Sequence, residues 1–223
     1  MTSLAIVFKR QIQREMLLHL RQPRLLLHSS LFFLMVAVFF PLTMPPQTSI
    51  MRTVAPGVVW IAMLLAMLLS SVNLFQQDYE DGAVEQWLIS GYPLSLIVSA
   101  KLLVHWFLNL LPMLIFSPLL ALLFNLTFVE TVILIASLIL GTPAILFLCG
   151  LAAAFSAGKG VLMALVLLPL TVPVMIFGSG SLFAVMQGFS AQGYLALLAA
   201  ISLLATAFLP FAIAGIIRIS LAD

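Results

Sequence analysis

Six long apolar stretches, none containing an acidic residue, a lysine or an arginine, dominate this sequence. An α-helix needs about 20 such residues to cross the hydrocarbon core of a bilayer. Lipid offers no hydrogen-bond partners to the backbone, so stretches of this kind fold as helices. The six predicted spans are Leu25–Met44, Val54–Phe75, Leu102–Leu126, Thr131–Ala154, Val161–Met186 and Tyr194–Ile217. We therefore predict an all-α, polytopic membrane protein with one transmembrane domain over residues 1–223.

The composition excludes a soluble globular fold. Hydrophobic residues make up 64% of the chain and charged residues only 7%, whereas soluble domains carry about 25% charged residues. A chain of 223 residues cannot bury that much apolar surface within itself. Nothing in this composition indicates nucleic-acid binding, and membrane lipid is the expected surrounding.

Lysine and arginine indicate the orientation, because they are enriched in cytoplasmic loops. With both chain ends in the cytoplasm, eight of the nine basic residues lie inside and only Arg52 lies outside. The eight are Lys9, Arg10, Arg14, Arg21, Arg24, Lys101, Lys159 and Arg218. We predict a membrane protein with both chain ends in the cytoplasm.

The segment before the first span is amphipathic. On a helix, one side of residues 2–22 carries Leu4, Phe8, Ile12 and Met16. The other side carries Arg10, Arg14 and Arg21. Such a helix lies in the membrane interface with its arginines toward phosphates or a partner. Residues 1–24 are either a simple topology anchor or a cytoplasmic elbow that helps to hold a soluble partner.

The loop between the second and third spans holds four of the seven acidic residues. On a helix, Asp78, Asp81 and Glu85 share one side, while Tyr79 and Trp87 share another. A glycine costs about 1 kcal/mol in a helix, so we expect a break near Gly82. The acidic edge is predicted to face water or a basic partner, with Tyr79 and Trp87 at the interface.

This loop resembles the cytoplasmic coupling element of ABC-2 permeases, in which acidic residues are followed by Gly, Glu, Leu and Pro. The matching residues here are Asp81, Gly82, Glu85, Leu88 and Pro93. The resemblance implies that the loop docks on a separate ATPase subunit. The residues expected to take part are Asp78, Tyr79, Glu80, Asp81, Gly82, Glu85, Trp87 and Leu88.

Four further motifs make the resemblance closer. They are Val54–Trp60, Ala100–Trp106, Leu140–Pro143 and Leu167–Val174. Together with the acidic loop, they resemble the haem exporter protein B (CcmB) family, the permease subunit of the cytochrome c maturation ABC transporter. The resemblance implies a homodimer that works with a cytoplasmic ABC ATPase, a haem-handling membrane subunit, a small single-span subunit and a periplasmic haem chaperone.

The chain lacks the means for several reactions. It has no G-x-x-x-x-G-K-[ST] loop, so ATP is expected on the partner subunit and no catalytic residue is assigned. Its one cysteine, Cys149, is expected to be a buried hydrophobe. Haem is likewise expected on partner subunits, with no cofactor or metal bound directly. His105 is a candidate haem contact; the alternatives are a hydrogen bond to a neighbouring helix or a place at the interface.

Prolines and glycines inside the predicted spans are candidate hinges. A proline removes a helical hydrogen bond and favours a kink, and small residues let helices approach closely. The residues are Pro143, Pro169, Pro173, Gly178 and Gly180. The alternative is ordinary packing between membrane helices.

Three other functional classes also use polytopic helical membrane proteins. An intramembrane serine protease needs a general base, and the sixth predicted span has no His, Asp, Glu or Lys. A proton- or sodium-coupled transporter is expected to carry ionisable groups in mid-membrane, where only His105 and Asn109 stand. A generic ABC-2 exporter of a lipid or another small hydrophobic molecule would also dock on an ATPase subunit through this loop, and it remains the alternative.

Overall fold

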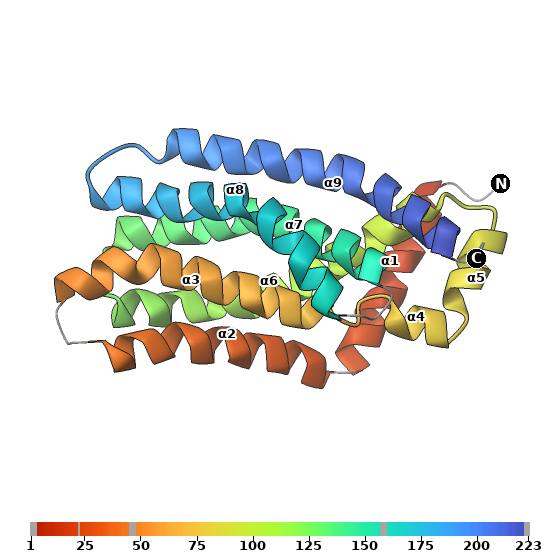
Figure 1. Ribbon diagram of the computed structural model, residues 1–223, viewed down its shortest axis with the longest axis horizontal. Coiled ribbons are helices and arrows are strands. Elements are labelled where there is room, and N and C mark those ends of the chain that lie inside the picture. Colours follow the sequence, from red (N-terminus) through yellow and green to blue (C-terminus); the bar gives the residue numbers. More distant parts are fainter. Residues whose placement is uncertain (1–3, 22, 45–47, 157–159, 221–223) are drawn as a thin grey trace.

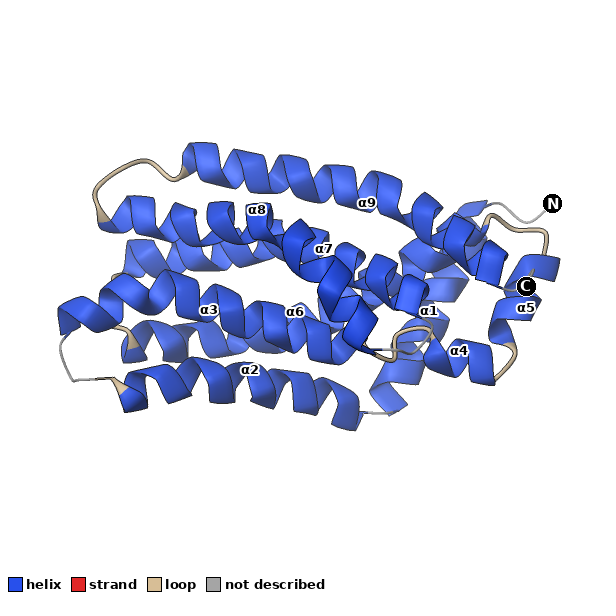
Figure 2. Ribbon diagram, viewed as in Figure 1, coloured by secondary structure: helices blue, strands red, loops and turns tan. Residues whose placement is uncertain are grey.

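The computed structural model describes residues 4–21, 23–44, 48–156 and 160–220 of the chain. Within these ranges the side chains of residues 23–26, 48, 156 and 160–168 are not described. Over the described residues the chain forms helices joined by short loops, without a strand (Figures 1 and 2). This confirms the predicted all-α class. Lys159 and the side chain of Arg24, both used to predict the orientation, lie outside the described part.

Six long helices lie side by side along the long axis of the molecule (Figure 1). They are α2 (Pro23–Thr43), α3 (Thr48–Ser71), α6 (Leu94–Leu123), α7 (Phe128–Ser156), α8 (Gly160–Met186) and α9 (Gln192–Ser220). Helix α7 packs most extensively, against α8 and α9, and it also contacts α6 and α3. Helix α2 packs mainly against α3 and α6 at the opposite edge of the bundle.

Three shorter helices gather at one end of this bundle (Figure 1). They are α1 (Leu4–Arg21), α4 (Gln76–Glu80) and α5 (Ala83–Ile89). The start of α1 and the end of α9 lie at the same end, which we call the terminus end. The predicted elbow and the predicted coupling element therefore lie close to both described ends of the chain.

Five described segments are long and apolar enough to cross a membrane, which makes this a multi-pass membrane protein. They are Ser49–Glu80, Leu94–Leu123, Phe128–Phe155, Pro169–Met186 and Gln192–Ser220. The predicted first span contains a shorter described apolar helix, Leu27–Thr43. The third predicted span begins too late, at Leu102, because the polar residues Ser95, Ser99 and Lys101 continue helix α6 instead of interrupting it.

The outward faces of the long helices are apolar, as expected for a protein surrounded by lipid. Phe39 on α2, Ile115 and Leu122 on α6, and Phe208 on α9 are all more than 60% exposed. The interior is filled by large side chains such as Trp60, which is fully buried. The bundle thus buries one set of apolar residues and presents a second set to the bilayer.

Trp60 of α3 fixes how closely two other helices approach. A Cβ atom added at Gly178 of α8 would lie 2.2 Å from the Trp60 indole, and one added at Gly141 of α7 would lie 2.5 Å from it. Gly180 packs closely against Tyr194: a Cβ atom added at Gly180 would lie 2.8 Å from the Tyr194 ring. Glycine is therefore needed at these positions for packing.

The proline hinge candidates lie inside helices that continue past them. Helix α7 runs through Pro143, and α8 runs through Pro169 and Pro173. Neighbouring helices stabilise such prolines where a lone helix would break. A hinge role for these residues and for Gly178 and Gly180 stays a prediction.

Replacing Gly178 with valine is expected to destabilise the bundle by about 1–3 kcal/mol, the usual cost of overpacking a filled core. The thermal unfolding midpoint of the purified protein in detergent measures the effect. Gly57→Ala is the matched control, because nothing lies within 4 Å of a Cβ atom added at this other helical glycine. An unchanged midpoint for Gly178→Val would show that the Trp60 contact does not limit the packing.

Candidate functional site

The predicted break in the acidic loop is present. Helix α4 ends at Glu80, Asp81 is its C-cap, and Gly82 adopts a left-handed conformation with φ of 67°. Glycine adopts this conformation without the steric cost of a Cβ atom. Helix α5 can therefore start in a new direction directly after α4.

The two faces of this element differ from the prediction at two residues. Asp81 and Glu85 are exposed as expected, and Glu80 is exposed beside them. Asp78, in contrast, is only 5% exposed and does not belong to the outward acidic edge. Trp87 is 6% exposed and packs in the hydrophobic core of the bundle, so it is not an interface anchor.

The remaining residues of the element either contact the bundle or are exposed on its surface. The hydroxyl groups of Tyr79 and of Ser220 at the end of α9 are 2.9 Å apart. Leu88 is half-buried against the core. Ile89, which the sequence analysis did not single out, is 84% exposed and ends α5 next to the acidic edge. We call Glu80, Asp81, Glu85 and Ile89 the outward edge.

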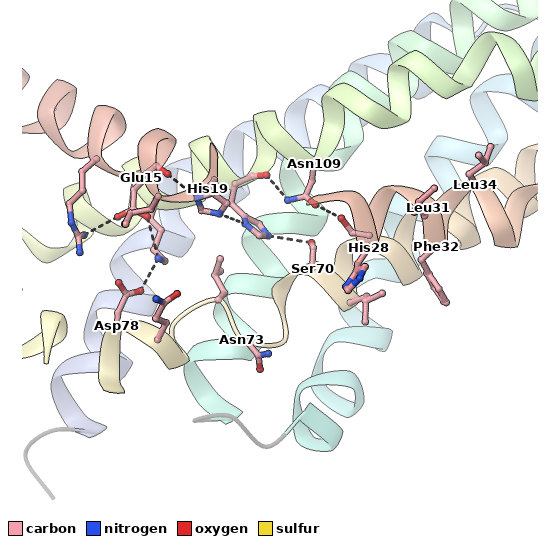
Figure 3. Close-up of a pocket in the computed structure, with 18 of the residues that line it drawn as sticks. Glu15, His19, His28, Leu31, Phe32, Leu34, Ser70, Asn73, Asp78 and Asn109 are labelled. Atoms are coloured by element: carbon pink, nitrogen blue, oxygen red, sulfur yellow. Dashed lines mark hydrogen bonds and ion pairs between the residues drawn. The ribbon is translucent and has the colours of Figure 1, made fainter. Parts of the chain in front are cut away.

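Asp78 turns inward because a buried lysine receives it. The Nζ atom of Lys101 on α6 lies 2.8 Å from Oδ2 of Asp78 and 3.3 Å from Oε2 of Glu15 on α1. Glu15 is fully buried and also binds Arg14 at 3.1 Å and Gln11 at 2.8 Å. One cation therefore joins helices α1, α4 and α6 at the terminus end (Figure 3).

Sequence reasoning missed Glu15 and the role of Lys101. Two signals were present. Glu15 is the only acidic residue among residues 2–22, and Lys101 lies alone between apolar runs. Because an isolated buried charge is costly, each of them indicated a partner of opposite sign, but only the fold shows that they meet each other.

A chain of hydrogen-bond contacts runs inward from this ion cluster (Figure 3). His19 Nδ1 lies 2.9 Å from the backbone oxygen of Glu15, and His19 Nε2 lies 3.2 Å from Nδ1 of His105. His105 Nε2 lies 3.3 Å from the hydroxyl of Ser70, which donates to the backbone oxygen of Met67. The expected hydrogen bond from His105 to a neighbouring helix is confirmed.

This series of four hydrogen-bond contacts contains fewer hydrogens than contacts. Two neutral imidazoles and one hydroxyl supply three hydrogens, and the backbone oxygens at both ends only accept. Both ring nitrogens of His19 and of His105 already have protein partners, and a haem contact by His105 stays a prediction.

A second polar pair extends the network along α6. The Asn109 amide donates to the backbone oxygen of His105 at 2.9 Å, and the Ser29 hydroxyl of α2 donates to the Asn109 oxygen at 2.8 Å. Buried polar groups of this kind hold membrane helices together, because lipid offers no alternative partner. The polar network therefore joins α1, α2, α3, α4 and α6.

A cavity of about 910 Å³ lies along this network. All three histidines of the chain line it, together with Glu15, Asp78 and Lys101. Its other walls are mostly apolar and come from α2 and from the end of α3. Among these are Leu31, Phe32, Leu34, Met35, Val38 and Leu69.

The basic face of α1 is exposed at Arg10, Arg14 and Arg21, as the amphipathic pattern predicts. The opposite face is not purely apolar, since Glu15 lies within it and packs toward α6. At the other end of the bundle, Arg52 of α3 pairs with Glu130 of α7. The one basic residue predicted outside is thus neutralised, which sharpens the charge difference between the two ends.

The described residues contain no group of three or more His, Cys, Asp or Glu side chains that could hold a metal ion. Cys149 is fully buried, as the sequence predicted. The site consists of an outward edge, a buried ion cluster behind it and an amphipathic cavity beside that cluster.

A multi-pass helical membrane protein with a charged cluster at one end of its bundle is the class that this fold and site define. The family model for the CcmB protein matches residues 6–220. Heme exporter protein B of Pseudomonas aeruginosa is 43% identical over 220 residues, covering 97% of this chain and 99% of the relative. The proteins of the same name from Haemophilus influenzae and Bradyrhizobium diazoefficiens are each 37% identical over nearly their whole lengths. This chain belongs to the CcmB family.

Removing the shared cation tests the ion cluster. Lys101→Met leaves the buried Glu15 and Asp78 facing each other without Lys101, and breaking a buried pair in this way costs about 3–5 kcal/mol. We expect a lower thermal unfolding midpoint in detergent, partly restored when Glu15→Gln and Asp78→Asn are added. Lys9→Met, at an exposed lysine of α1, is the control. If Lys101→Met behaved like Lys9→Met, the cluster would not stabilise the fold.

Proposed function

We propose that this chain is the permease subunit of an ABC transporter that serves haem delivery for cytochrome c maturation. Its relatives match 97% of this chain and 99% of their own length, and their name supports the haem exporter role. ATP hydrolysis takes place on a separate cytoplasmic subunit. The chain itself acts as the membrane-spanning transmitter, not as an enzyme.

The outward edge is the proposed ATPase-docking surface. The observation that carries this proposal is the combination of exposed acidic side chains with an exposed apolar residue. Glu80, Asp81 and Glu85 present negative charge, and Ile89 adds an apolar tip that is 84% exposed. An apolar residue in a pocket, surrounded by charges that guide the encounter, is a common way to build a specific interface.

The buried side of the same element supports a route for transmitting movement. Asp78 binds Lys101 of α6, which also binds Glu15 of α1, and Tyr79 contacts Ser220 of α9. A push on α4 and α5 by a closing ATPase dimer would therefore move three helices of the bundle together. ATP hydrolysis is coupled in this way to release of the haem-loaded periplasmic chaperone.

The full assembly follows from the same proposal. The protein spans the bacterial inner membrane six times, with α2 as the first span and both chain ends in the cytoplasm. Two copies pair with two ATPase subunits, beside a haem-handling subunit and a small single-span subunit. The basic face of α1, with Arg10, Arg14 and Arg21, lies at the cytoplasmic interface, where it contacts phosphates or the ATPase.

Reversing the charge of the outward edge tests the docking. The double variant Asp81→Lys and Glu85→Lys, and separately Ile89→Asp, are expected to reduce co-purification of the ATPase by at least about tenfold, the effect of losing about 1.4 kcal/mol. Cytochrome c maturation should fall in parallel. Gln187→Lys, at an exposed residue of the opposite end, is the control. Normal co-purification and maturation in both edge variants would refute the docking role.

Cysteine labelling tests the orientation. Cys149 is the only cysteine and is fully buried, so background labelling should be low. In intact cells, an impermeant maleimide should label Gln187→Cys but not Asp81→Cys, and opening the inner membrane should expose the latter. The reverse pattern would place the acidic edge in the periplasm, away from any cytoplasmic ATPase.

A further inference from the structure

The cavity between α1, α2, α3 and α6 has two chemically different halves. Figure 3 shows Glu15, His19 and Asp78 toward one side and Leu31, Phe32 and Leu34 toward the other. Its volume of about 910 Å³ is within the range of natural ligand sites. A molecule that fits this cavity has a polar part and an apolar part.

The apolar half opens on the lipid-facing surface. Four of the residues that line the cavity are themselves 40–60% exposed: Leu18, Leu31, Met35 and Leu69. A side chain that borders both the cavity and the outside marks its mouth. The mouth therefore leads into the bilayer, and a ligand can enter sideways with its chains remaining among the lipids.

The polar half selects a head group with both signs of charge. Lys101 binds the buried carboxylates of both Glu15 and Asp78, while Arg14 binds Glu15 through Nη1, which leaves its other N–H groups for a ligand. Closer to the surface, the side chain of Arg14 is 42% exposed and Asp81 is exposed; both line the cavity. A phosphate suits the guanidinium group, and an ammonium group suits the carboxylate.

The amide-bearing residues Asn73 and Gln77, both exposed, lie in the same part of the lining. Their oxygens accept hydrogen bonds, which a primary ammonium group donates and a quaternary one cannot. We propose that this cavity binds one glycerophospholipid with a phosphoethanolamine head. The phosphate lies by Arg14, the ammonium group lies by Asp81, and the acyl chains follow Leu31, Met35 and Val38 along α2.

Haem is the rival occupant of a cavity lined by three histidines. An axial ligand must offer a free ring nitrogen, and the nitrogens of His19 and His105 contact the protein. His28 also lines the cavity and is exposed, and none of these contacts occupies its ring nitrogens. A haem in this cavity would depend on His28 alone, whereas the lining offers both signs of charge and the apolar wall that a phospholipid requires. This inference concerns a bound lipid and does not depend on the proposed transport role.

Native mass spectrometry of the full chain in detergent tests the inference. The protein is delipidated, supplied with palmitoyl-oleoyl phosphatidylethanolamine, phosphatidylcholine or phosphatidylglycerol, and the retained lipid is counted. We expect one phosphatidylethanolamine to be retained at least about tenfold more than either of the others. Met35→Trp, which narrows the mouth of the cavity, and Arg14→Gln should each reduce this retention by about tenfold.

The matched controls are Phe39→Trp, one turn further along the lipid-facing side of α2, and Lys9→Gln at an exposed position of α1. Both should retain phosphatidylethanolamine like the unchanged protein, and a monodisperse elution profile reports folding of every variant. Equal retention of the three lipids, unchanged retention in Met35→Trp, or a haem absorbance spectrum that Met35→Trp abolishes would each overturn the proposal. These measurements involve no ATPase, so failure of the docking proposal leaves them unaffected.

Discussion

The salt bridges of Lys101 hold together the end of the protein where its chemistry is concentrated. A lysine with an 8% exposed side chain is stable in this setting only because Asp78 and Glu15 lie within 3.3 Å of it. These two carboxylates belong to segments that have little other reason to meet. Helix α1 precedes the bundle, and α4 interrupts it between two long helices. One buried cation therefore ties both short helices to α6, in addition to the packing of α1 on α6 and the contact between His19 and His105.

Charge is placed very differently at the two ends of the bundle. At the terminus end, the buried ions are surrounded by an exposed basic face on α1 and an exposed acidic edge on α4 and α5. At the opposite end, Arg52 and Glu130 neutralise each other and the remaining surface is mostly uncharged. A membrane protein with this asymmetry can recruit charged partners on one side and leave the other side to packing and lipid contacts.

The histidine chain, the ion cluster and the cavity share walls, so they form one polar region inside an otherwise apolar bundle. Trp60 and the glycines opposite it form the contrasting region, where helices α3, α7 and α8 meet through shape alone. The apolar region is close-packed and resists changes in volume, whereas the polar region borders a cavity.

The sequence by itself determined the helical class, most helix positions, the break at Gly82, the exposed acids Asp81 and Glu85, and the family, because each of these depends on residues close together in the chain or on their order. Only the tertiary structure decided that Asp78 turns inward, that Trp87 joins the core and that Gly178 must be small. Asp78 meets Lys101 of α6, Gly178 meets Trp60 of α3, and Trp87 packs in the core of the bundle, so each outcome depends on residues from other helices. An amphipathic pattern shows that a helix has two faces; which neighbour each face meets is set by the packing of the whole bundle.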